Sequence, residues 1–131
     1  MCQRRSYINF AHSRRTIVFK VMAFNPRTPN KVLSEYWGAV YTLGQRAEAE
    51  GRFNNKQALD HGRIFGGAIH VFPRHPTGYR PHAFNLSDKT MARTAVVRCL
   101  VDPLDYIASG WNHDDIPTAC YRAITPLEVL Q

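Results

Sequence analysis

KVLSEYWGAVYTLGQRAEAE, residues 31–50, is the stretch on which the predicted fold class depends. Apolar side chains recur in it every three or four positions, which is the period of an amphipathic helix. They are Leu33, Tyr36, Trp37, Val40, Leu43 and Ala47. Asn30 can cap the first turn of such a helix, and Gly51 can end the last one. The pattern predicts one long helix whose apolar stripe is buried in the core.

Segments rich in β-branched and aromatic residues lie on both sides of this helix and predict a small sheet. They cover residues 16–21, 64–72, 94–101 and 119–124. The segment 94–101 is the strongest and is expected at the centre, and Pro126 is expected to end the last strand. Residues 104–107 fit either a short strand or a helical turn. Together these elements predict an α+β fold, with one long amphipathic helix packed on a small, mainly antiparallel sheet.

The composition is that of one ordinary globular domain. The chain has 131 residues, of which 44% are hydrophobic and 21% charged, so it can form a single core and is not typical of disorder. Its apolar runs are too short to span a bilayer, and no membrane association is expected. Three cysteines do not make a disulfide framework and suit a reducing compartment. We therefore expect a cytoplasmic protein, and its oligomeric state stays open.

The positive charge is concentrated at the N-terminus. The net charge is +7, and residues 1–21 contain cations but no acid. Four of these cations are candidate phosphate contacts: Arg4, Arg5, Arg14 and Arg15. Residues 1–21 are interpreted as a basic arm or as an upstream extension, because Met22 is a plausible alternative start, and a targeting segment is a third possibility. Residues 22–131 are then the compact domain, which is expected to fold without the arm.

The stretch PRHPTGYRPHA, residues 73–83, is the second basic segment. Three prolines exclude regular structure, so it is expected to be a surface loop. Its cationic and aromatic side chains are the other candidate contacts to a nucleic acid or anion: Arg74, His75, Tyr79, Arg80 and His82. Arginine can bind phosphate through two hydrogen bonds, and aromatic or imidazole rings can stack on bases. The alternative is a solvated connection whose cations only maintain solubility.

No pattern in the chain assigns an enzyme active site. The histidines lack the spacing of a zinc site, and no Cys-x-x-Cys pair is present, so neither metal nor cofactor is expected. Cys99 and Cys120 lie in apolar segments that are typical of buried thiols. No glycine-flanked nucleophile is present. We therefore predict no catalytic residue, and binding is favoured over catalysis.

Residues 68–124 resemble the C-terminal module of the rapid-lysis B proteins of large tailed phages. The resemblance lies in AIHV at 68–71, VVRCLV at 96–101, VDPLDYI at 101–107 and CYRAI at 120–124. It departs in the longer loop at 73–83 and in the displaced closing Cys-Tyr. It implies a phage or mobile-element accessory protein and assigns no catalytic residue. The stretch VDPLDYI is also similar to a strand of small ADP-ribosyltransferases, among them a phage anti-CRISPR enzyme, although no catalytic glutamate can be placed.

These observations predict a small binding protein. The leading hypothesis is a phage or mobile-element accessory protein that binds a nucleic acid or a host nucleoprotein complex, with an anti-defence, anti-CRISPR-like inhibitor as one form of it. One alternative is an ADP-ribosyltransferase-like enzyme that uses NAD. The other is a virion-associated structural protein, for which an exposed apolar patch would be the mark.

Overall fold

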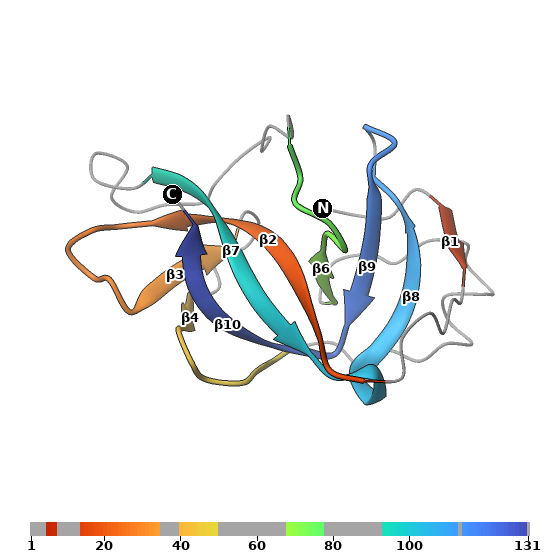
Figure 1. Ribbon diagram of the computed structural model, residues 1–131, viewed down its shortest axis with the longest axis horizontal. Helices are drawn as coiled ribbons and strands as arrows, with labels where there is room; N and C mark the ends of the chain where they lie inside the picture. The colour runs from red at the N-terminus through yellow and green to blue at the C-terminus, as the bar shows by residue number, and fades with distance from the viewer. Residues whose placement is uncertain are drawn as a thin grey trace.

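Two antiparallel β-sheets make up the described part of the computed structural model (Figure 1). The structure describes residues 5–7, 14–34, 40–49, 68–77, 93–112 and 114–130. The larger sheet has the strand order β4-β3-β2-β7-β10-β5 and the smaller one β1-β8-β9-β6. The larger sheet consists of β2 (Thr16–Phe24), β3 (Lys31–Ser34), β4 (Val40–Thr42), β5 (Ala47–Glu48), β7 (Arg93–Val101) and β10 (Ala123–Leu130). The smaller sheet consists of β1 (Arg5–Tyr7), β6 (Ile69–Val71), β8 (Tyr106–Trp111) and β9 (Pro117–Tyr121).

The long pair of β2 and β7 forms the centre of the larger sheet. Nine consecutive residue pairs join the two strands, from Thr16 opposite Val101 to Phe24 opposite Arg93. Side chains alternate between the two faces of a strand. Val18 and Met22 accordingly point inward and are buried, together with Cys99 of β7. This confirms the predicted central strand at 94–101 and extends the one predicted at 16–21.

Two of the passages between the sheets lie at neighbouring corners. A 3₁₀ turn, Pro103–Asp105, connects β7 to β8, and Asp102 caps it by accepting a hydrogen bond from the Leu104 N–H at 2.9 Å. Arg122 alone separates β9 from β10, and its N–H donates to the Asp105 carbonyl at 2.8 Å. Because this bond joins the corners, the two crossings are held as one unit.

The inner faces of the two sheets form the main core. It combines residues of the larger sheet, such as Val97 and Val101, with Val71 and Tyr121 of the smaller one. The rings of Tyr106 and Tyr121 meet edge to face, with their centroids 5.7 Å apart. The expected sheet is therefore present, but a second sheet covers it where a helix was predicted.

The predicted helix at 31–50 is wrong, and with it the α+β fold class. Its described residues form β3, β4 and β5, and the described ranges contain no α-helix. Val32 and Ser34 are buried while Lys31 is exposed, which is the two-residue period of a strand. Gly44 has φ of 83°, a left-handed conformation that an α-helix cannot contain.

Burial within this segment also differs from the prediction. Val40 is 58% exposed, whereas Leu43 is partly buried against the main core. Trp37 lies outside the described residues. β-branched and aromatic residues fit strands as well as they fit one face of a helix, which explains the mistaken period.

The remaining expectations are met in part. The described part of the strand predicted at 64–72 forms β6, and residues 64–67 lie outside the described ranges. The segment 119–124 is divided between β9 and β10. Pro126 does not end the last strand, because β10 continues past it with a register shift before Glu128. At 104–107 both alternatives occur in succession, a 3₁₀ turn and then β8. The boundary expected after residue 21 falls inside β2, so removing residues 1–21 would take away most of a central strand.

Candidate nucleic-acid interface

Arg14 and Arg15 lie directly before β2 and are exposed. The Arg15 side chain is 71% exposed, and its Nε lies 3.5 Å from Asp102 Oδ2 at the corner. Exposed ion pairs of this kind contribute little free energy, because water and salt screen them. The contact therefore orients Arg15 without preventing it from binding another anion.

The segment 72–77 is attached to β2 by an antiparallel bridge. Phe19 N–H donates to the Phe72 carbonyl at 2.8 Å, and Phe72 N–H donates to the Phe19 carbonyl at 2.7 Å. Phe72 itself is buried. Since the pairing is antiparallel, the chain leaves Phe72 in the direction of the start of β2.

His75 packs against the outer side of β2. Its ring lies 5.8 Å from the Phe19 ring, centroid to centroid, with the two planes tilted by 56°. The Thr77 N–H donates to the His75 carbonyl at 2.9 Å, and Thr77 Oγ1 lies 3.4 Å from His75 Nδ1. Pro76 is buried, whereas Arg74 and His75 are exposed. The loop is thus fixed at Phe72 and Pro76 and presents the two side chains between them.

The two predicted basic segments meet at β2. Arg15 precedes Phe19 by four residues, and a strand rises about 3.3 Å per residue, so their backbones are separated by about 13 Å. The loop contacts β2 at Phe19, and therefore Arg74 and His75 lie at the same end of the strand as Arg14 and Arg15. We call Arg14, Arg15, Phe19, Arg74 and His75 the β2 basic surface.

The structure describes only part of the predicted site. Arg14, Arg15, Arg74 and His75 are seen at the surface as expected. The other predicted contacts lie outside the described residues or side chains: Arg4, Arg5, Tyr79, Arg80 and His82. For Arg5 the backbone is described, and it pairs in β1 opposite Trp111 of β8. Phe19 was not predicted as a site residue, although strand alternation beside inward-facing Val18 places it on the outer face.

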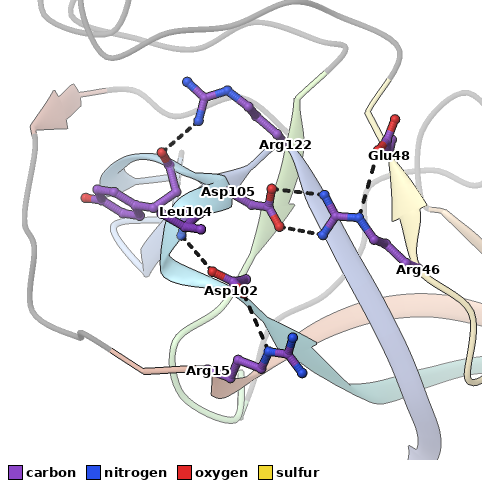
Figure 2. Close-up of polar contacts among 8 residues, drawn as sticks. Arg15, Arg46, Glu48, Asp102, Leu104, Asp105 and Arg122 are labelled. Carbon is purple, nitrogen blue, oxygen red and sulfur yellow. Dashed lines mark hydrogen bonds and ion pairs between the residues drawn. The ribbon is translucent and has the colours of Figure 1, made fainter.

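A second group of arginines lies at the corner between the sheets. Figure 2 shows the Arg46 guanidinium facing the Asp105 carboxylate, with two hydrogen bonds of 2.6 and 3.0 Å. Glu48 adds an ion pair to Arg46 at 3.8 Å. Arg122 Nη1 donates to the Tyr106 carbonyl at 3.1 Å. These side chains link β5 and β10 to the 3₁₀ turn and have a structural role.

Lys20 is a charged residue on the inward face of β2. It lies between the buried Val18 and Met22, and its Nζ donates to the His70 carbonyl of β6 at 2.8 Å. The ammonium thereby binds a backbone oxygen at the edge of β6 that faces β2. The residues around Lys20 are apolar on both faces of β2, so the sequence alone does not show that Lys20 points inward.

The His70 side chain is buried on the opposite face of the smaller sheet from the main core. Burial, and secondly the positive charge of Lys20, hold the pKa of His70 well below its usual 6.5. Thr118 shares this face, because His70 pairs with Cys120 and Thr118 lies two residues earlier on β9. Neither His70 Nε2 nor Thr118 Oγ1 has a hydrogen-bond partner among the described residues. His70 is therefore a neutral, interior group and not a surface base.

The two described cysteines do not form a reactive site. Cys99 and Cys120 are buried thiols, as the apolar segments predicted. Burial raises the pKa of Cys99 to about 12, opposite to the shift that activates a thiolate nucleophile. Within the described ranges no three histidine, cysteine or acidic residues are grouped to hold a metal ion.

Comparison with known proteins identifies no relative. No protein-family model, no curated protein and no solved structure matches this chain. The described residues also include no helix long and apolar enough to cross a membrane. The resemblance to phage rapid-lysis B proteins, and the functions and cellular location that it implies, remain predictions.

Proposed function

We propose that this protein binds a nucleic acid through the β2 basic surface. The observation that carries the proposal is the bridge between Phe19 and Phe72, which brings two basic segments far apart in sequence to one end of β2. Such a cluster of exposed guanidinium groups suits a phosphate backbone, which offers closely spaced anions. Binding of this kind needs no catalytic group.

The distribution of acidic residues supports this choice of surface. Asp102, Asp105, Glu48 and Glu128 each form an ion pair with an arginine, and of these four pairs the Asp102 pair involves Arg15 of the β2 basic surface. Arg74 forms no ion pair within the described ranges. An incoming phosphate at Arg74 would therefore displace no acid of these ranges.

The geometry also favours a defined contact over a diffuse one. Arg15 is oriented by Asp102, and Arg74 follows a backbone fixed to β2. Arginines held in this way lose less conformational freedom on binding than those of a free tail. A host nucleoprotein complex, as the leading hypothesis has it, would present the same phosphate chemistry.

The test is fluorescence anisotropy of labelled DNA and RNA against salt concentration. The double variant Arg15→Ala, Arg74→Ala should bind at least roughly tenfold more weakly. Its log–log salt slope should be less steep by about 1.4 to 1.8, since each phosphate contact contributes about 0.7 to 0.9.

The matched control is Arg27→Ala, Lys31→Ala. These exposed cations lie beyond the other end of β2, and their removal changes the net charge equally. The control should retain nearly the affinity of the unmodified protein. Equal losses in both variants, or no salt-dependent binding at all, would reject the β2 basic surface as the site.

A further inference from the structure

The outer side of β2 offers an aromatic platform in addition to positive charge. Phe19 is half-buried, and the exposed His75 lies across it with the ring centroids 5.8 Å apart. The tilt of 56° means that the two rings do not stack on each other. A flat aromatic group can therefore pack on the face of the His75 imidazole. The Phe19 ring then lies along one edge of that group.

The platform is held by the backbone and not by the rings alone. Phe72 forms two hydrogen bonds with Phe19, and Thr77 contacts both the carbonyl and the ring of His75. Pro73 and the buried Pro76 restrict the backbone on either side. A ring fixed in advance loses less entropy when another ring stacks on it.

The position of the arginines decides which flat group fits. Arg74 is adjacent to His75 in the chain, and Arg15 lies about 13 Å from Phe19 along β2. A ligand that contacts His75 and both arginines must carry a flat face beside anionic groups. Nucleotides in a single strand have this form, because their bases are free to leave the backbone and stack on protein rings. In a duplex the base faces are already stacked on one another.

We propose that the β2 basic surface selects single-stranded DNA or RNA over duplex, with an unpaired base stacked on His75 beside Phe19. This inference rests on the proposed function and adds the form of nucleic acid to it. The chemistry is shared by both kinds of strand, because every base has an aromatic face.

The test compares four labelled probes on the full chain by fluorescence anisotropy. They are a short oligothymidylate, the corresponding oligouridylate, a duplex of the same length, and an abasic strand with the same phosphates. Both base-bearing strands should bind roughly tenfold more tightly than the duplex or the abasic strand. Unequal affinity for the two base-bearing strands would show which sugar the surface prefers, and would support the inference provided that the tighter one exceeds the duplex.

The variant His75→Ala isolates the stacking contribution. It should lose roughly tenfold in affinity for the base-bearing strands and less than twofold for the abasic strand. His75→Phe, which retains a ring, should restore binding. A thermal unfolding curve for each variant shows that the domain is folded.

The outcomes separate the two proposals. Duplex binding as tight as single-strand binding, or equal losses of His75→Ala on the base-bearing and abasic strands, would overturn the stacking inference and leave the basic surface intact. Failure of every probe to bind would overturn both.

Discussion

Arginines lie at both the corner of residues 102–105 and the edge of residues 72–77, and their surroundings differ between the two regions. At the corner, Asp102 and Asp105 form ion pairs with Arg15 and Arg46, which tie β2 and β5 of the larger sheet to the 3₁₀ turn. At the edge, Arg74 has no acid partner within the described ranges. The difference shows that net charge alone does not identify a binding surface: Arg46 is held by two hydrogen bonds to Asp105, whereas the Arg15 side chain is 71% exposed and Arg74 forms no ion pair in the described ranges.

Truncation of the chain should have the largest effect on stability of the changes that we predict. Deleting residues 1–21 removes Arg14 and Arg15 but also six of the nine β2 residues that pair with β7. We expect the truncated chain to lose cooperative unfolding, as measured by circular dichroism on heating. A folded truncated domain would show that β2 is dispensable and that the arm is a separate unit after all.

Asp105→Ala should destabilise the corner without affecting binding. The Asp105 side chain is 14% exposed and accepts two hydrogen bonds from Arg46, so its loss should cost about 1–2 kcal/mol in the free energy of unfolding. Urea titration measures this change. Affinity for nucleic acid should stay the same, and a parallel loss of affinity would mean that the corner is part of the binding surface.

Acid should destabilise the fold through His70. The unfolded histidine gains a proton as the pH falls below about 6.5, whereas the folded one, with its lowered pKa, does not. The unfolded state then binds more protons, and the free energy of unfolding should fall by up to about 1.4 kcal/mol per pH unit until the folded pKa is reached. His70→Phe should flatten this dependence in urea titrations at several pH values. If the pH dependence of the free energy of unfolding were unchanged in the variant, a group other than His70 would take up the proton on unfolding.

Arg74→Ala should have the smallest effect on stability. Arg74 is exposed and forms no ion pair in the described ranges, so the free energy of unfolding should change by less than about 0.5 kcal/mol. Nucleic-acid affinity should nevertheless fall, the reverse of the result for Asp105→Ala. A shift in urea midpoint with unchanged affinity would make the edge structural, like the corner.

Strands whose residues favour only a strand could be predicted from the sequence. The segment whose residues fit both a helix and a strand could not. Residues 94–101 combine β-branched side chains with no competing period, and they form the central strand. In residues 31–50 the apolar side chains satisfy a helical period, while Val32, Tyr41 and Thr42 equally favour strands. Tertiary pairing with β2 decides between the two, and no local pattern contains that information.

The site shows the same division between local and long-range information. The basic and aromatic composition of the loop was sufficient to select Arg74 and His75. That the loop lies beside Arg15 depends on one bridge between Phe19 and Phe72, residues more than fifty positions apart. For the same reason Phe19 could not be recognised as a candidate, since its partner ring comes from the far segment.

The pairing of β2 with β7 has a consequence for how the chain folds. Closing Phe24 onto Arg93 encloses about 70 residues, so the entropy of loop closure must be lost before any of the nine pairs is gained. The hairpin of β8 and β9 is local and can form first. During synthesis at about 5–20 residues per second, β2 stays unpaired with β7 for several seconds, until β7 has been synthesised. Refolding from urea should therefore be slow for a chain of this length, and stopped-flow fluorescence completed within milliseconds would contradict this order.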